Sequence, residues 1–163
     1  ATTEIYTLSL HDALPISNMT IAVERRDLLR NMACFVCNVQ EAGLLFSEDY
    51  ESMTPGQLAP VLVDRIRVGE IPQMVVTMGA EGAVYATTEG DYGCCAALNG
   101  DVVDTTGCGD AFFAGVCIGL TYGKSLRESC QIGIRLASSV IATRENVCPR
   151  FLPAEFGLEV APE

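Results

Sequence analysis

Basic residues are scarce in this sequence. Its 163 residues include only 10 lysines and arginines against 21 aspartates and glutamates, and the formal net charge at pH 7 is −11. Nucleic-acid binding depends on a basic surface that neutralises phosphates, so this balance argues against such a partner. The sequence also lacks an apolar run of membrane-spanning length and a secretory signal with a basic start and a small-residue cleavage site. We therefore expect a protein that neither binds nucleic acid nor crosses a membrane.

Histidine is nearly absent, with His11 as the single example, whereas there are eight cysteines. Cys34 and Cys37 have the C-x-x-C spacing of some zinc sites, but they lie in an apolar run, where a strand would direct the two side chains to opposite faces. No second C-x-x-C pair follows, and His11 is remote in the sequence. Buried free cysteines are common in protein cores, so we expect reduced thiols and a cytoplasmic protein rather than a zinc or disulfide framework.

Apolar residues make up 49% of the sequence and charged residues 19%, a balance typical of one globular domain with a buried core. Residues 1–17 do not lead into the pattern of the rest, and the string resembles translated sequencing-adapter text. We expect this segment to be a non-native leader; the alternative is a genuine short strand and turn. The adjacent His11 and Asp12 therefore receive no role.

The stretch from Val102 to Gly115 carries the strongest signal for chemistry. A short apolar run ends in a turn of acidic, hydroxyl and glycine residues, and an apolar helix pattern then begins with Asp110 at its start. Glycines bring successive backbone N–H groups close to a ligand and a helix N-terminus adds unpaired donors, so the turn predicts an anion site that suits phosphate. A carboxylate facing that site could take a proton from a hydroxyl that attacks phosphorus. Taken alone, G-x-G-D is equally well explained by Asp110 as a helix cap.

The string Asp104-Thr-Thr-Gly-Cys-Gly-Asp110 resembles the C-terminal signature of the PfkB (ribokinase-like) family of sugar and nucleoside kinases, which usually reads D-T-x-G-A-G-D-x-F. Only Cys108 departs from it, in place of the common alanine. Cysteine is small and the position acts through its backbone N–H, so the change should be tolerated. The resemblance implies that Asp110 is the catalytic base. It also implies that the amides of Gly107, Cys108 and Gly109 form the anion hole for the transferring phosphoryl group.

Asn38-Val39-Gln40-Glu41 lies where a buried strand predicted over residues 33–39 gives way to an apolar helix start over residues 41–46. Ligands of parallel α/β sheets collect at the carboxyl ends of the strands. The four residues are similar to the family's N-x-x-E motif, which implies that Asn38 and Glu41 help to hold Mg²⁺, largely through water, and the nucleotide phosphates. Mg²⁺ prefers oxygen ligands and keeps several waters. The alternative is ordinary helix capping by the two residues.

The segment from Thr77 to Gly82 lies between strands predicted over residues 73–78 and 83–86. Its glycine spacing alone is typical of a β-turn. The segment resembles the family's T-x-G-x-x-G nucleotide loop, and it lies in the family's order between N-x-x-E and the G-x-G-D turn. This resemblance implies that Thr77, Gly79 and Gly82 bring the backbone close to ATP.

The resemblance also assigns roles at five further positions. Asp104 and Thr106 correspond to positions that in several members contribute to a monovalent-cation site, often for K⁺; the alternative is an Asx or hydroxyl turn. Arg135, Ser138 and Ser139 lie in the later part of a helix that in the family runs near the adenine ring. Their alternative role is plain helix surface or packing.

Hydrophobic periodicity predicts helices over residues 24–32, 54–69, 111–122 and 125–143 and a further strand over residues 92–98. Ser125 and Glu128 have the spacing of a capping box, and Gly115 and Gly119 allow close packing of their helix against a sheet or helix. Residues 146–163 are expected to form a tail that crosses the surface. With the resemblance, the pattern predicts a three-layer α/β/α ribokinase-like fold, here truncated, with a mostly parallel sheet flanked by helices.

The resemblance covers residues 19–158, and we assign residues 18–163 to the C-terminal nucleotide-binding and catalytic part of a PfkB-type kinase domain. The amino-terminal part, which in the family carries the sugar-contacting motifs and a small β lid, is expected to be absent. The function implied is an ATP- and Mg²⁺-dependent phosphotransferase acting on the hydroxymethyl group of a sugar, with nucleosides and phosphosugars as alternative substrates. We expect the isolated fragment to be inactive and the full-length parent to be a homodimer. A non-catalytic nucleotide-binding fragment and a pseudokinase or regulatory parent remain open.

Overall fold

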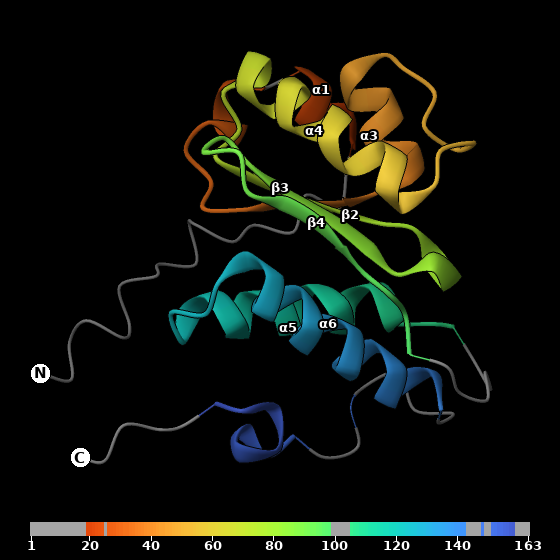
Figure 1. Cartoon of the computed structure of the whole chain (residues 1–163), viewed down its shortest axis with the longest axis vertical. Helices are drawn as coiled ribbons and strands as arrows, with labels where there is room; N and C mark the ends of the chain where they lie inside the picture. Colours follow the sequence, from red (N-terminus) through yellow and green to blue (C-terminus); the bar gives the residue numbers. More distant parts are fainter. Residues whose placement is uncertain (1–18, 25, 99–104, 143–147, 149–150, 159–163) are drawn as a thin grey trace, which may run out of the picture. The chain divides into compact units, whose positions relative to one another are not determined.

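The computed structural model describes residues 19–24, 26–98, 105–142, 148 and 151–158 (Figure 1). Its contacts divide the chain into two compact units, residues 1–96 and residues 97–163. The expected leader with His11 and Asp12 lies outside the described residues, and so does Asp104. No helix in the described ranges is long and apolar enough to cross a membrane.

The first unit is built on a sheet whose four described strands follow the chain order: β1 (Phe35–Asn38), β2 (Gln73–Thr77), β3 (Ala83–Thr87) and β4 (Tyr92–Cys95). β1 pairs with β2 in parallel, whereas the β2–β3 and β3–β4 pairs are antiparallel. The expected α/β class is confirmed, but this sheet is mixed rather than mostly parallel. The reason is the length of the connections: short turns can join only antiparallel neighbours, and a parallel pair needs a long crossover. β4 also ends at Cys95, before the predicted end of that strand.

Four helices accompany the sheet in this unit: α1 (Met19–Glu24), α2 (Arg26–Leu29), α3 (Val39–Phe46) and α4 (Pro55–Gly69). α1, α3 and α4 lie on one face of the sheet (Figure 1). Leu58, Leu62 and Ile66 recur every four residues along α4 and are fully buried in the same cluster as Met74 and Val76 of β2. The apolar stripe of α4 and alternate residues of the strands therefore make one core.

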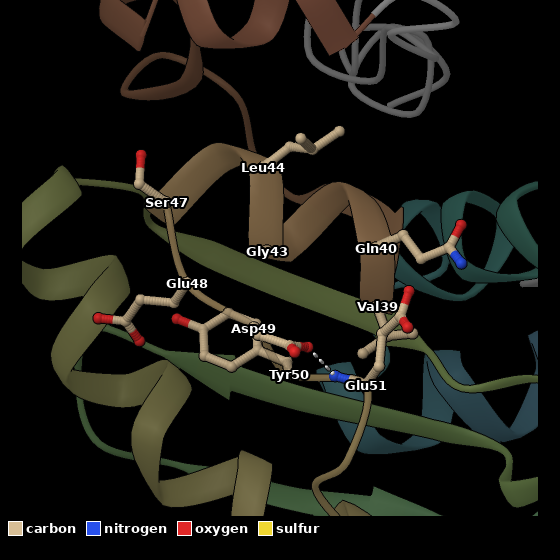
Figure 2. Close-up of a pocket in the computed structure, with 9 residues that line it drawn as sticks. All are labelled: Val39, Gln40, Gly43, Leu44, Ser47, Glu48, Asp49, Tyr50 and Glu51. Carbon is tan, nitrogen blue, oxygen red and sulfur yellow. Dashed lines mark hydrogen bonds between the residues drawn. The ribbon is translucent and has the colours of Figure 1, made fainter.

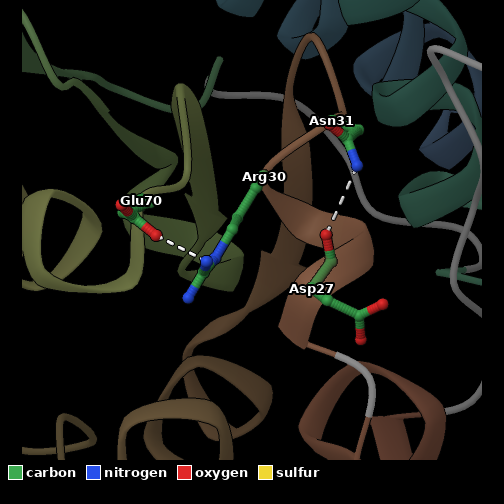
Figure 3. A network of polar contacts seen from close by, with 4 residues as sticks. All are labelled: Asp27, Arg30, Asn31 and Glu70. Carbon is green, nitrogen blue, oxygen red and sulfur yellow. Dashed lines mark hydrogen bonds and ion pairs between the residues drawn. The ribbon is translucent and has the colours of Figure 1, made fainter.

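In place of the single helix predicted over residues 24–32, the structure has two short helices. α1 begins before the predicted range, and α2 ends at Leu29. Polar contacts tether the segment around α2 to its neighbours (Figure 3). The Arg30 Nη1 atom lies 2.7 Å from Glu70 Oε2 at the end of α4, and Arg26 donates from Nη2 to the Leu45 carbonyl at 2.7 Å. The Arg30–Glu70 pair is exposed, so it stabilises the fold only slightly.

The second unit contains two helices in close contact, α5 (Cys108–Thr121) and α6 (Leu126–Ile141). A Cβ atom added at Gly115 would lie 2.5 Å from the Cα atom of Gly133, and one at Gly119 would lie 2.5 Å from Ser129 Oγ. The expected close packing through Gly115 and Gly119 is confirmed, and the partner is α6. The capping box at the start of α6 is confirmed as well: Ser125 N–H donates to Glu128 Oε2 at 2.9 Å, and Glu128 N–H donates to Ser125 Oγ at 3.3 Å.

The C-terminal segment does more than cross the surface. It contains a short 3₁₀ helix, η2 (Pro153–Phe156), and the side chain of Leu158 is only 1% exposed because it packs against Ile132 and Leu136 of α6. The prolines made this segment resemble a free tail, but the apolar residues between and after them bind it to the helix.

Replacement of Gly115 by alanine should lower the free energy of unfolding by about 1–3 kcal/mol, because its Cβ would overlap backbone atoms of α6. Gly109→Ala is the matched control in the same helix: its Cβ would meet nothing within 4 Å, and Gly109 has no positive φ. We expect that control to stay within about 0.5 kcal/mol of the parent chain. Urea unfolding measures both changes, and equal effects of the two variants would contradict the close-packed pair of helices.

Candidate functional site

Two of the predicted motifs meet at one edge of the sheet. Asn38 and Thr77 end the parallel strands β1 and β2 and stand opposite each other in the strand register. The Thr77 hydroxyl donates to the Cys37 carbonyl at 3.4 Å, which ties the end of β2 to the end of β1. Asn38 is exposed and Thr77 is half-buried. The carboxyl edge of this parallel pair therefore presents polar groups from both motifs, as the ligand sites of α/β sheets do.

Asn38 and Glu41 form a complete capping box at the start of α3. Asn38 Oδ1 accepts the Glu41 N–H at 2.9 Å, and Glu41 Oε2 accepts the Asn38 N–H at 2.8 Å. The capping alternative is thus present in the structure. The capping box uses only one oxygen of the Glu41 carboxylate, Oε2. The other oxygen, Oε1, makes no hydrogen bond to a described residue. The cap instead holds a charged oxygen in a fixed place at the sheet edge.

The side-chain oxygens of Asn38 and Glu41 suit a magnesium ion that keeps most of its bound water. Carboxylate and amide oxygens are the hard ligands that Mg²⁺ prefers. Within the described ranges, no group of three or more His, Cys, Asp or Glu side chains could enclose a metal ion. If Glu41 and Asn38 hold the ion, water must supply most of its other ligands. Burial first, and the Glu41 carboxylate second, raise the pKa of the Cys37 thiol above its usual value.

The turn between β2 and β3 is a tight one with exposed backbone. The Met78 N–H donates to the Gly82 carbonyl at 2.8 Å, and a short 3₁₀ helix, η1 (Gly79–Glu81), lies between them. Gly79 has a φ of 59°, which glycine adopts more readily than other residues. A Cβ at this position would meet nothing within 4 Å, so the glycine is needed for the backbone conformation and not for packing. The N–H groups of Gly79 and Ala80 make no hydrogen bond to a described residue. The β-turn alternative is correct as a description, and the turn still offers donors to a ligand.

The first turn of α5 is open in the same way. Gly107 is the N-cap with a φ of 79°, and it supplies no side chain to pair with the helix N–H groups. The Cys108 N–H reaches the Thr105 carbonyl at 3.3 Å and the Ala111 N–H reaches the Gly107 carbonyl at 2.9 Å, whereas the N–H groups of Gly109 and Asp110 have no described partner. A helix start with unpaired donors attracts an anion.

Asp110 occupies the third position of α5 and is not its N-cap residue. Its side chain is exposed, and it makes no hydrogen bond or ion pair with a described residue. The capping alternative therefore gains little support here, since a capping side chain bonds a backbone N–H. Thr106, the described member of the predicted cation pair, is exposed in the turn that precedes α5.

The three predicted positions on α6 differ in their contacts. Arg135 donates from Nη2 to the Glu155 carbonyl, and its guanidinium carbon lies 4.6 Å from the centre of the Phe156 ring. Ser139 Oγ donates to the Leu136 carbonyl at 2.7 Å. Ser138 is half-buried, and its carbonyl accepts the Ala142 N–H at 3.2 Å. Arg135 is thus engaged by the C-terminal segment, and Ser139 by its own helix.

The predicted site residues divide between the two units. Asn38, Glu41, Thr77, Gly79 and Gly82 belong to the first unit, where the structure brings Asn38, Glu41 and Thr77 to one sheet edge. The second unit holds Thr106, the turn from Gly107 to Asp110, and the α6 residues.

Sequence reasoning missed a cavity of about 670 Å³ in the first unit. Residues from α3 and the loop after it line the cavity (Figure 2): Val39, Gln40, Gly43, Leu44, Ser47, Glu48, Asp49, Tyr50 and Glu51. None of them is a predicted site residue. Three carboxylates on its walls repel phosphate, so this cavity is a poor candidate for a nucleotide. Burial first, and the Glu48 carboxylate second, raise the pKa of Tyr50 to about 12, so its hydroxyl stays neutral. The acidic run after α3 was the only signal in the sequence.

Comparison with known proteins agrees with the motifs. The family model described as "pfkB family carbohydrate kinase" matches residues 5–149. The guanosine-inosine kinase of Exiguobacterium acetylicum is 34% identical over 142 residues, which cover 84% of this chain and 45% of that protein. The chain spans about half the length of the curated relatives that it matches along most of its own length. The matched range begins inside residues 1–17, and the assignment of that segment stays a prediction.

Solved structures show the same fold. A probable sugar kinase from Rhizobium etli CFN 42 superposes with a TM-score of 0.69 at 28% identity, over 88% of this chain and 44% of that one. Arabidopsis thaliana ribokinase, solved with ribose and ATP, has a TM-score of 0.65 over 74% of this chain and 38% of that one, and at 23% identity it speaks for the fold alone. The expected ribokinase-like fold is confirmed.

Glu41→Gln should separate metal binding from capping. Glutamine keeps an oxygen that accepts the Asn38 N–H, but it loses the negative charge that favours Mg²⁺. We expect the Mg²⁺-dependent part of ATP affinity to fall by about tenfold, or about 1.4 kcal/mol, while the free energy of unfolding changes by less than about 0.5 kcal/mol. Calorimetric titration of ATP with and without Mg²⁺ measures the first quantity, and urea unfolding measures the second.

Glu128→Gln is the matched control, because Glu128 fills the same place in the capping box of α6 and has no predicted role in binding. It should change neither quantity. If the two glutamine variants bind Mg²⁺-ATP equally well, Glu41 has only a capping role.

Proposed function

The chain belongs to the pfkB family of carbohydrate kinases, and we propose that it carries the nucleotide-binding and base-bearing part of an ATP-dependent phosphotransferase whose acceptor is an alcohol. The observation that carries this proposal is the open first turn of α5. There an exposed carboxylate, Asp110, directly follows Gly109, and the backbone N–H groups of both residues have no described partner. An oxyanion-binding turn with a base beside it is what transfer of a phosphoryl group to a hydroxyl requires.

In the proposed reaction, the amides of Gly107, Cys108 and Gly109 donate to oxygens of the transferring phosphoryl group. The helix start holds the Gly109 N–H without a described partner before the substrate arrives, so this donor needs little reorganisation as negative charge develops. Cys108 takes part through its backbone, and its N–H must exchange the long contact to Thr105 for the phosphoryl oxygen. Asp110 accepts the proton of the incoming alcohol.

The first unit is proposed to hold the nucleotide. The turn from Thr77 to Gly82 offers its free N–H groups to ATP, and the fixed carboxylate of Glu41 with Asn38 holds Mg²⁺ through water. When bound, the ion neutralises charge on the phosphates. Ser138 on α6 is proposed as a neighbour of the nucleotide base. K⁺ at Asp104 and Thr106 stays a prediction.

The proposed acceptor is the hydroxymethyl group of a sugar, in keeping with the family and with the sugar kinase from Rhizobium etli. A ribonucleoside is the second candidate, and the observation that favours it is the 34% identity with a guanosine-inosine kinase. Both compounds present a primary alcohol, so the same base and the same anion-binding turn serve either one. Assay of the full-length protein with a panel of sugars, phosphosugars and nucleosides separates them.

Two further features complete the proposal. A reducing, cytoplasmic location is proposed, because none of the eight described cysteines forms a disulfide. The full-length protein is proposed to act as a homodimer on a small molecule and ATP. A nucleotide-binding chain without catalysis is the competing function, and release of phosphorylated product by the chain would exclude it.

Asp110→Asn in the full-length protein should lower kcat by about 10²–10⁴-fold, because the amide keeps the shape of the side chain but accepts no proton. The affinity for ATP should stay within about twofold, since the carboxylate is proposed to act on the alcohol. Steady-state kinetics and calorimetric ATP titration measure the two quantities. Asp64→Asn, at an exposed position on α4, is the control for loss of one charge. Near-full turnover of Asp110→Asn refutes its role as the base.

A further inference from the structure

Arg135 on α6 holds the C-terminal segment, residues 151–158, by two contacts. Its Nη2 atom donates to the Glu155 carbonyl, and the guanidinium carbon lies 4.6 Å from the centre of the Phe156 ring. A planar guanidinium can donate in its plane and stack with its face at the same time, which a lysine ammonium cannot do. The planar shape of arginine, and not only its charge, therefore suits it to this position.

The segment that Arg135 holds is the cover of an apolar cluster. The Phe151 and Phe156 rings lie 4.9 Å apart, and both pack against Ile132, Leu136 and Leu158. Of these, Leu158 is only 1% exposed. Burial of this kind keeps the segment on α6 and closes the cluster.

The same cluster reaches the first turn of α5. Ala111 packs against it, and Ala111 directly follows Asp110. The Ala111 N–H closes the turn by donating to the Gly107 carbonyl at 2.9 Å. The turn has no capping side chain, and Gly107 and Gly109 add backbone freedom, so it depends on support from outside the helix. Ala111 is a residue of this turn that packs against the cluster.

We propose that Arg135 is a positioning residue for Asp110. By fastening residues 151–158 it keeps the cluster closed beneath Ala111, and the closed cluster fixes the first turn of α5 that carries the base and the anion-binding amides. The inference rests on the proposed function for the role of Asp110. It differs from the expectation that Arg135 lies beside the adenine ring, because here Arg135 acts through packing and needs no contact with the nucleotide.

Hydrogen exchange of the 163-residue chain tests the structural step without any turnover. Arg135→Gln removes the stack and the charge, and Phe156→Leu removes the ring but keeps an apolar side chain. Each should speed exchange of the Ala111 to Phe113 amides by about tenfold, and the double variant should add little because both act on one contact. Arg135→Lys should fall between Arg135→Gln and the parent chain.

Arg67→Gln is the matched control. Arg67 is exposed and also donates to a backbone carbonyl, that of Thr88 at 3.0 Å, but it belongs to the first unit. It should leave exchange in α5 unchanged. Equal acceleration along the whole of α5 and α6 in Arg135→Gln, Val116 included, would show a merely structural role and overturn the inference.

Kinetics of the full-length protein tests the catalytic step. Arg135→Gln and Phe156→Leu should both lower kcat by about tenfold and leave the KM for ATP within about twofold. If Arg135 contacts the nucleotide instead, Arg135→Gln raises that KM, Phe156→Leu does not, and the inference is overturned. Failure of the proposed function has a different signature, namely full turnover of Asp110→Asn whatever Arg135→Gln does.

Discussion

Backbone N–H groups without a partner are the constraint on which this account depends. Such groups are costly where they are buried, and at a helix start they need a side chain, water or a ligand as partner. In this chain they remain without a described partner, at exposed residues, in two glycine turns: in η1 and at the start of α5. Glycine permits the positive φ of Gly79 and Gly107, and a Cβ at Gly79 or Gly109 would meet nothing, so neither turn is dictated by packing. We propose that the turns provide donors for oxygens of a ligand.

Close packing and helix capping surround these turns. The close contact of Gly115 with Gly133 locks α5 to α6, and the capping box of Asn38 and Glu41 fixes the start of α3 beside the end of β2. One pair of side chains thereby serves two purposes, because the hydrogen bonds that begin the helix also orient the carboxylate proposed for Mg²⁺. Electrostatic catalysis needs donors that are in place before charge develops.

Local chemistry made much of this predictable from the sequence. Three features act within a few residues or through a simple steric rule, and the structure agrees with all of them. They are the capping pair Ser125 and Glu128, Pro55 at the start of α4, and the paired glycines of α5. The α/β class and the motif order were also readable. The mixture of parallel and antiparallel pairs was not, because pairing direction follows from connection length as well as from residue pattern. The burial of Leu158 and the contacts of Arg135 depend on residues distant in the sequence, which periodicity does not relate.

An amide-resolved NMR titration of the chain with Mg²⁺-ATP tests the central claim most directly. The account predicts that the N–H signals of Gly79, Ala80, Gly109 and Asp110 shift together and saturate at one ATP concentration. It also predicts that the signals of residues 47–51, in the acidic cavity, stay in place. Shifts confined to the cavity, or none at the two glycine turns, would contradict it.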